Sequence, residues 1–281
     1  MIGIFDSGFG GLTVMKEYLK KYPEFDYMYL GDQANSPYGS HSSERVNKLV
    51  VQNVEFLAKK GCKLIIVACN TASADALRHV QQIYKGKPVI LGVLVPACEE
   101  ALRTTRFGRI GIIGTRGTIK SGAYERELKK YQPLLYKPSD KRALKNVSAI
   151  SVSAPLLVPL VEEGMIKSTP TRMILKSYLR PLKNAHVDTL ILGCTHYPLL
   201  GNEIKRMMGK QVAIISSAKA AADSIDSYFA GHPEIKKSLS RHGGQAKSGK
   251  RIYYTTDSPE RFADLGSRFL GEKISVEKVE I

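Results

Sequence analysis

The fold is decided by two stretches, LIIVACNTAS at residues 64–73 and TLILGCTHYP at residues 189–198. In each stretch a short apolar run leads to a lone cysteine, and small polar residues follow. The apolar run predicts a buried strand, and the polar residues after it predict the beginning of a helix. Cys69 and Cys194 stand at matching positions, 125 residues apart, so the two stretches form an internal repeat.

Apolar runs and helical patterns alternate along the whole chain. Between Ser43 and Lys60, apolar residues and Asn53 recur on one helical face, and Gly61 ends the predicted helix. Strands are expected at residues 1–5, 25–30, 63–68, 88–93, 109–114, 188–193, 211–215 and 251–255. This alternation predicts an α/β protein with mainly parallel sheets, of the Rossmann-like or flavodoxin-like kind.

A second pair of matching stretches divides the chain into two halves. GIFDSG at 3–8 matches GIIGTR at 111–116, which aligns Ser7 with Thr115. The segment from Thr115 to Cys194 is 17 residues longer than the segment from Ser7 to Cys69, and we assign the excess to an insertion within 131–150. We therefore expect two similar α/β domains, the first over 1–95 and the second over 97–208. Residues 210–281 also alternate strand and helix and are expected to add to one of the two sheets.

The composition is that of a globular protein. The chain has 281 residues, of which 43% are hydrophobic, and apolar stretches such as Val89 to Cys98 are far shorter than a membrane-spanning helix. The N-terminal MIGIFDSG lacks the basic and apolar segments of a signal peptide. We therefore expect a soluble, cytoplasmic protein that does not bind a membrane. Four cysteines without a CxxC pair or zinc spacing predict free thiols, with neither disulfides nor a metal site.

The chain is strongly basic, with 42 Lys and Arg against 26 Asp and Glu and a formal net charge of +16. Such a charge attracts anions, either a small acidic substrate or a nucleic acid. The densest basic stretches lie within 129–145 and 236–251, and neither interleaves aromatic residues or matches a DNA-binding motif. We therefore interpret them as solvated surface, and nucleic-acid binding is the less favoured alternative.

Polar and nucleophilic residues stand where the predicted strands end and helices begin. In open α/β sheets this edge binds ligands, and a helix N-terminus there lowers the pKa of a thiol. If the two halves face each other across a pseudo-twofold axis, Cys69 and Cys194 lie on opposite sides of one cleft. One thiolate then removes a proton from a carbon and the other thiol delivers a proton to the opposite face, which inverts the stereocentre. The residues at these ends are Asp6, Ser7, Cys69–Thr71, Thr115 and Cys194–His196.

The sequence resembles the glutamate racemases of the cofactor-independent aspartate/glutamate racemase superfamily over nearly its whole length. The blocks that carry the resemblance are FDSGFGGLTV (5–14), NSPYG (35–39), ACNTASA (68–74), IGTRGTIKSGAY (113–124), PLLVPLVEEG (155–164) and LGCTHYPLL (192–200). The resemblance implies interconversion of L- and D-glutamate without pyridoxal phosphate, other cofactors or metal, which supplies D-glutamate for peptidoglycan and cell-wall synthesis. It also implies that 210–281 returns to the first domain.

The resemblance further implies the roles of individual residues. Cys69 and Cys194 correspond to the two acid/base residues, assisted by Asp6, His196 and Glu162. The residues implied to contact substrate are Asp6, Ser7, Tyr38, Gly39, Asn70, Thr71, Thr115, Thr118, Thr195 and His196. A homodimer is compatible with the sequence, which does not determine the oligomeric state. An aspartate racemase, or another racemase on the same scaffold, is the alternative activity, and His196 after Cys-Thr favours glutamate.

Several of these residues also have a purely structural interpretation. Asp6 and Ser7 could cap the helix that begins near Gly11, and His196 could cap the helix after it. Glu162 could lie on a solvated helical face, and Pro37-Tyr38-Gly39 could be a simple turn. The glycines at 8, 10 and 11 resemble a nucleotide-binding loop, but the Lys-Ser/Thr of a P-loop is missing and Thr13 replaces the third glycine of a dinucleotide motif.

Overall fold

The computed structural model describes residues 1–135, 146–240 and 248–281. In these ranges the strands form two parallel sheets, one of six strands and one of four, so the predicted α/β class is confirmed. The first sheet, in the order β10-β9-β2-β1-β3-β4, consists of β1 (Ile2–Asp6), β2 (Tyr27–Gly31), β3 (Leu64–Val67), β4 (Val89–Gly92), β9 (Arg251–Thr255) and β10 (Glu277–Lys278). The second sheet, in the order β6-β5-β7-β8, consists of β5 (Arg109–Gly114), β6 (Ser148–Ser153), β7 (Thr189–Gly193) and β8 (Ala213–Ser216).

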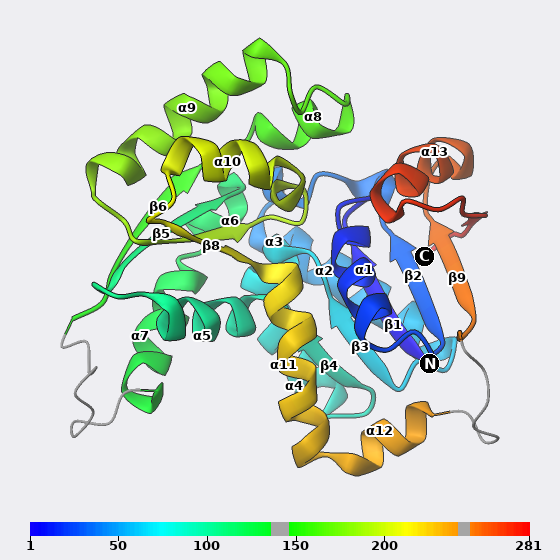
Figure 1. The fold of residues 1–281 in the computed structure, drawn as a ribbon. Coiled ribbons are helices and arrows are strands. Elements are labelled where there is room, and N and C mark those ends of the chain that lie inside the picture. The colour runs from blue at the N-terminus through cyan, green and yellow to red at the C-terminus, as the bar shows by residue number, and fades with distance from the viewer. Residues whose placement is uncertain (136–145, 241–247) are drawn as a thin grey trace.

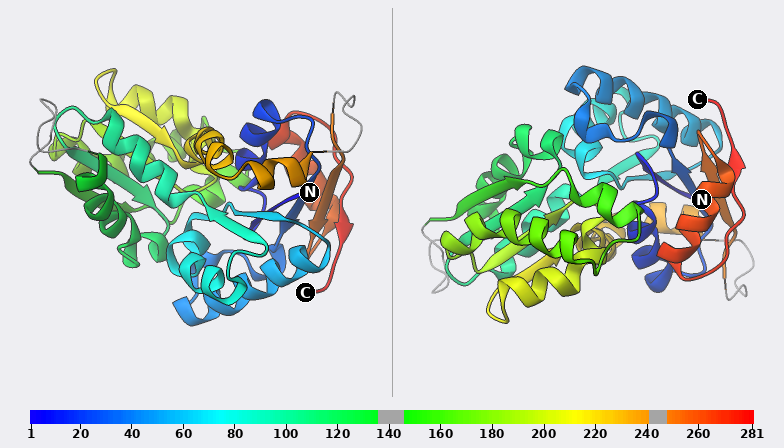
Figure 2. Two further views of the ribbon diagram at one scale, coloured as in Figure 1. Left: turned by 90° about the horizontal axis from the view of Figure 1, so that it is seen from below. Right: turned by 90° about the horizontal axis from the view of Figure 1, so that it is seen from above.

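Helices alternate with the strands and cover the faces of the sheets, and both marked chain ends lie on the lobe of the first sheet (Figure 1). Views from below and above show the two sheets as separate lobes side by side (Figure 2). No helix in the described ranges is long and apolar enough to cross a membrane. The α-helices are α1 (Leu12–Lys21), α2 (Ser43–Lys59), α3 (Asn70–Asp75), α4 (Leu77–Tyr84), α5 (Leu94–Thr104), α6 (Arg116–Lys120), α7 (Ala123–Leu135), α8 (Leu157–Glu162), α9 (Thr169–Asn184), α10 (Gly201–Met208), α11 (Ser217–Gly231), α12 (Pro233–Leu239) and α13 (Pro259–Leu270), and the 3-10 helices are η1 (Gln33–Asn35), η2 (Tyr38–Ser40) and η3 (Tyr197–Leu200).

The strands that carry the site are central and fully covered by helices. Every residue of β1, β3 and β7 is buried, as expected for parallel strands packed on both faces. Helix α2 confirms the predicted helix after Ser43, and its buried face includes Asn53 among the apolar residues. The packing of these buried strands fixes the positions of their carboxyl ends, and the site lies at these ends.

Two parts of the architecture differ from the sequence expectation. Strand β8 pairs with β7 in the second sheet, so assigning the whole of 210–281 to the first domain was wrong for residues 213–216. Strands β6 and β10 were not expected from the sequence. Strand β6 lies at the edge of its sheet and is only half-buried. Its sequence alternates serine with small and apolar residues, so it contains no continuous apolar run. The predicted insertion within 131–150 and the basic stretch at 129–145 both include residues 136–145, which lie outside the described residues. The basic stretch at 236–251 includes residues 241–247, which also lie outside them.

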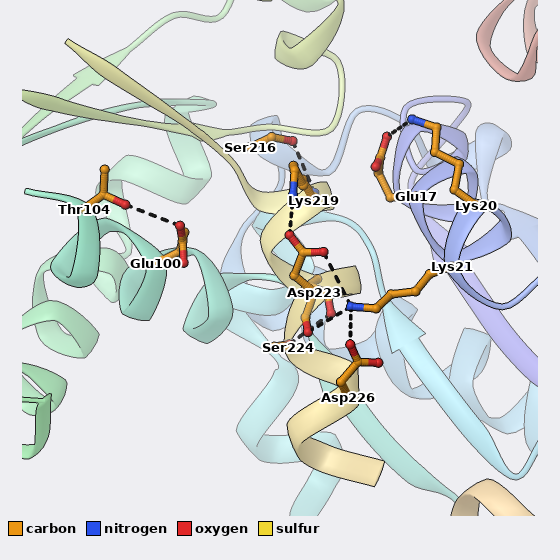
Figure 3. A network of polar contacts seen from close by, with 11 residues as sticks. Glu17, Lys20, Lys21, Glu100, Thr104, Ser216, Lys219, Asp223, Ser224 and Asp226 are labelled. Atoms are coloured by element: carbon orange, nitrogen blue, oxygen red, sulfur yellow. Dashed lines mark hydrogen bonds and ion pairs between the residues drawn. The ribbon is translucent and has the colours of Figure 1, made fainter. Parts of the chain in front are cut away.

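Helix α11 connects the two lobes. It follows β8 of the second sheet and packs against both α5 and α1. At the end of α1, Lys21 Nζ lies 2.6 Å from Asp226 Oδ2 and 3.5 Å from Asp223 Oδ1 on α11, and Asp223 also pairs with Lys219 at 2.5 Å (Figure 3). Because these ion pairs are exposed, each contributes little to stability, and the network mainly fixes how α11 lies against α1.

Candidate active site

The carboxyl ends of β1, β3, β5 and β7 surround one small cavity between the two sheets. Its volume is about 30 Å³, room for one or two water molecules but not for an amino acid. The lining residues are Ser7, Ser36, Pro37, Tyr38, Gly39, Cys69, Asn70, Thr71, Thr115, Val158, Cys194, Thr195 and His196. A hollow of about 740 Å³ between α4, α5, α7 and α11 is lined by neither Cys69 nor Cys194, so the paired thiols identify the smaller cavity as the candidate site.

Cys69 lies at the end of β3, at the N-cap position of α3, with 6% of its surface exposed. Its Sγ donates to Ser7 Oγ at 3.7 Å. Burial, and then the charge of Asp6, raise the pKa of Cys69 to about 12, against a smaller opposite effect of the Ala72 N–H in α3. In this state Cys69 is therefore a protonated thiol, suited to donate a proton.

Cys194 has different surroundings at the end of β7. Its Sγ lies 3.9 Å from His196 Nδ1, and His196 Nε2 lies 3.0 Å from Glu162 Oε1. Burial alone would lower the pKa of His196, but Cys194 and then Glu162 raise it to about 10. His196 is therefore an imidazolium at neutral pH, and it places a positive charge next to the Cys194 sulfur.

Asp6 is fully buried behind Ser7. Its Oδ2 accepts from the Gly8 N–H at 3.1 Å, and its Oδ1 accepts from Thr195 Oγ1 at 3.4 Å. Burial raises the pKa of Asp6, and His196 partly opposes this effect. Backbone hydrogen bonds from Gly8 and Gly11 also oppose the rise, so Asp6 contacts the backbone where helix α1 begins, although the N-cap residue Gly11 itself makes no side-chain cap bond.

Three threonine hydroxyls join the two sheets beside Cys69. Thr71 Oγ1 lies 2.9 Å from Thr115 Oγ1 and 3.1 Å from Thr118 Oγ1, and the latter two are 3.0 Å apart. Thr115 also caps α6 by accepting from the Thr118 N–H at 3.2 Å. Hydroxyls can turn to donate or accept, so this cluster can supply donors to a carboxylate.

Two glycines allow loops of the two sheets to touch. A Cβ on Gly10 would lie 2.2 Å from Thr195 Oγ1 and 2.5 Å from His196 Nδ1. A Cβ on Gly39 would lie 2.7 Å from Thr115 Oγ1. The close approach of Gly10 to the segment after Cys194 accounts for a glycine at this position without any bound nucleotide.

The segment after β2, which brings Tyr38 and Gly39 to the cavity, is held by residues that sequence reasoning missed. Asp32 accepts from the Tyr38 hydroxyl at 2.5 Å and from Thr256 Oγ1 at 2.9 Å, and Asn53 Nδ2 donates to the same hydroxyl at 2.8 Å. Thr256 Oγ1 also accepts from the Ala34 N–H at 3.0 Å. The signal available in the sequence was Asn53, a polar residue on the apolar face of α2.

Most predicted site residues line the cavity, and the others stand behind it. Asp6, Thr118 and Glu162 each contact a lining residue: Thr195, Thr71 and His196 respectively. His196 occupies the N-cap position of η3, and in the described residues its ring makes no capping bond. Ser36, Pro37 and Val158 line the cavity without having been predicted, although they lie within the blocks NSPYG and PLLVPLVEEG.

Residues 12–225 match the family model of the Asp/Glu/hydantoin racemases, which is most of the chain. The chain therefore belongs to the family of Asp/Glu/hydantoin racemases. It is 40% identical over 273 residues to the glutamate racemase of Geobacter metallireducens, covering 97% of this chain and 93% of the relative. It is 41% identical to the glutamate racemase of Aquifex aeolicus, covering 97% and 95%. These relatives place the chain among the glutamate racemases of that family.

Solved structures agree with this placement. The fold matches glutamate racemase RacE1 from Bacillus anthracis with a TM-score of 0.88 and 36% identity, covering 100% of this chain and 97% of the other. It matches the Francisella tularensis glutamate racemase in complex with D-glutamate with a TM-score of 0.84 and 31% identity, covering 99% and 97%. The predicted family and the predicted fold are thus both confirmed.

Proposed function

We propose that this chain is a glutamate racemase that interconverts L- and D-glutamate with Cys69 and Cys194 as the two acid/base residues. The observation that carries the proposal is that both thiols line one cavity and have unlike neighbours, a buried carboxylate near one and an imidazolium beside the other. Supporting it, the Francisella tularensis relative is described in complex with D-glutamate. A formal net charge of +16 also favours an acidic substrate.

The proposed reaction needs only the two sulfur atoms and the substrate. One cysteine, as the thiolate, takes the hydrogen of the α-carbon as a proton, so that the C–H bond breaks, an S–H bond forms and the electron pair stays on the substrate. The opposite thiol then gives its proton to the other face of the same carbon and becomes the thiolate. Reversal of the two roles converts the other enantiomer.

The surrounding residues have assisting roles in this proposal. His196 with Glu162 places a positive charge beside Cys194, and the charge of Asp6 acts on Cys69. Tyr38, Gly39, Thr115, Thr118 and Thr195 hold the substrate together with Ser7, Asn70 and Thr71. Since the cavity of about 30 Å³ is smaller than glutamate, the lining segments of the two sheets have to move apart to admit it.

The direct test is circular dichroism or chiral chromatography of the purified protein with L-glutamate and no added cofactor. We expect the optical activity to decay to that of the racemate. The same assay with aspartate tests whether aspartate is the preferred substrate. A faster rate on aspartate than on glutamate would contradict the assignment to glutamate.

The roles of the two thiols are tested by Cys69→Ser and Cys194→Ser. Each is expected to lower turnover by roughly 10²–10⁴-fold, because a hydroxyl is far less acidic than a thiol. Cys62→Ser is the matched control, since Cys62 is buried and packs in the core next to Gly3. Near-normal turnover of either active-site variant would refute the two-thiol scheme.

In the cell, we place this activity in the cytoplasm, where it supplies D-glutamate for peptidoglycan. A homodimer stays a prediction, and sedimentation analysis at several concentrations tests it. Specific nucleic-acid binding is the less favoured alternative, and duplex DNA titrated at physiological salt would reveal it.

A further inference from the structure

The side chain of Asn70 is only half satisfied. Asn70 follows Cys69, has 2% of its surface exposed and lines the cavity. Its Oδ1 accepts a hydrogen bond from the Tyr124 hydroxyl at 2.7 Å, whereas its Nδ2 is buried and has no hydrogen-bond partner among the described residues. A buried amide that keeps unused N–H donors is unfavourable for folding, so such a group at a cavity points to a ligand that accepts from it.

Tyr124 is fixed in place from several sides. It lies on α7 with 1% of its surface exposed, and its carbonyl oxygen accepts from Cys98 Sγ at 3.8 Å. A Cβ on Gly193 would lie 3.1 Å from Tyr124 Cε2, so the ring packs directly on the strand that leads to Cys194. Burial also raises the pKa of Tyr124 well above its ordinary value, which keeps the hydroxyl protonated.

The chemistry of the two groups fixes which end of the amide faces Tyr124. The neutral Tyr124 hydroxyl has one hydrogen to donate, and within the described part of the chain Asn70 Oδ1 is the acceptor it reaches. If the amide were turned over, the oxygen would face the cavity and the hydroxyl hydrogen would lose its acceptor. The observed hydrogen bond therefore favours the orientation in which the Nδ2 hydrogens are available to a ligand.

We propose that Tyr124 is a positioning residue for the substrate: it orients the Asn70 amide so that the Nδ2–H group donates to a carboxylate of glutamate. This inference rests on the proposed function. Asn70 follows β3 of the first sheet and Tyr124 follows β5 of the second, so the donor is oriented only when the two sheets are together. Recognition of the acidic substrate by one half of the protein thus depends on a hydroxyl from the other half.

The first test is Tyr124→Phe, which removes the hydroxyl and keeps the ring. We expect KM for both L- and D-glutamate to rise by about 3- to 10-fold, the effect of one neutral hydrogen bond, with a smaller change in kcat. Tyr253→Phe is the matched control, because the Tyr253 hydroxyl is buried without a partner in the described residues. We expect this control to leave KM unchanged, and thermal unfolding of both variants shows whether they fold.

The second test separates positioning from general packing. In an Asn70→Ala background, adding Tyr124→Phe is expected to change KM by less than about twofold, because Tyr124 acts through Asn70. Effects that multiply would overturn the proposal. Asn70→Asp keeps an acceptor for Tyr124 but turns an oxygen toward the cavity, so it is expected to bind glutamate more weakly than Asn70→Ala in calorimetric titration. Equal or tighter binding by Asn70→Asp would also overturn it, even if Tyr124→Phe does not fold.

The two proposals fail in different ways. A wild-type protein that does not racemise glutamate overturns the proposed function. A wild-type protein that racemises glutamate, together with a folded Tyr124→Phe variant of unchanged KM, overturns only the role of Tyr124.

Discussion

The charge of Glu162 is the feature whose removal gives the sharpest prediction. Glu162 Oε1 lies 3.0 Å from His196 Nε2 in a mostly buried pair. The pKa of His196, about 10 against an ordinary 6.5, means that its surroundings favour the protonated ring by roughly 5 kcal/mol. Since Cys194 and Glu162 share this effect, we expect Glu162→Gln, which keeps the size of the side chain, to remove roughly 2 kcal/mol of it.

The sign of the pH dependence follows from the raised pKa. A group whose pKa is higher in the folded protein stabilises the fold fully below its ordinary pKa of 6.5, and this stabilisation is lost as the pH rises through about 10. The free energy of unfolding of Glu162→Gln should therefore be lower than that of wild type by about 2 kcal/mol near pH 6, and this difference should shrink as the pH rises towards about 10 and be small above it. Urea denaturation at several pH values measures this difference.

The titration of His196 itself is the second readout. In nitrogen-labelled protein, NMR should show that the ring loses its proton at lower pH in Glu162→Gln than in wild type, with the His196 signal identified by its absence in His196→Asn. Glu163→Gln is the matched control, because Glu163 is the exposed neighbour on the same segment. The reasoning would be refuted by an unchanged His196 titration, or by a stability difference that stays constant from pH 6 to pH 11.

Two further predictions concern the contacts that assemble the cavity. Gly10→Ala places a Cβ 2.2 Å from Thr195 Oγ1, so we expect a loss of roughly 1–3 kcal/mol in unfolding free energy and lower turnover, measured by urea denaturation and the racemase assay. Gly201→Ala, where no described atom lies within 4 Å, should instead stabilise by roughly 0.4–1 kcal/mol, and equal effects at the two sites would contradict this reasoning. Thr256→Val removes the hydrogen bonds that hold the segment after β2 and should raise KM more than it lowers kcat. Thr256→Ser keeps the hydroxyl and should retain the wild-type KM. A Ser variant as impaired as the Val variant would show that the hydroxyl is not responsible.

The central strands could be predicted because buried parallel strands are continuous apolar runs. LIIV in β3 and the strand before Cys194 are of this kind, and both were found where the sequence placed them. Strand β6 was missed because an edge strand that is half-exposed needs no such run. The pairing of β8 could not be predicted, because a strand carries no local mark of the sheet that it joins.

The candidate site divides in the same way. The repeat around Cys69 and Cys194 predicted residues that now line one cavity, since parallel strands bring their carboxyl ends to the same edge. The bond from Thr256 to Asp32 spans 224 residues, and the bond from Tyr124 to Asn70 joins the two sheets. Such partners depend on the three-dimensional fold and leave no spacing pattern in the sequence. The chemical roles of the lining residues stay predictions.

The unequal neighbours of the two cysteines that line the cavity have a practical consequence for covalent chemistry. Burial raises the pKa of Cys62 to about 11 and that of Cys69 to about 12, and it holds the pKa of Cys98 well above its ordinary value. Cys194 alone among the four cysteines has the His196 cation beside it. A covalent inhibitor that carries an anionic group could therefore pair with the histidine cation next to the sulfur that it attacks, and this arrangement would distinguish Cys194 from the other three thiols.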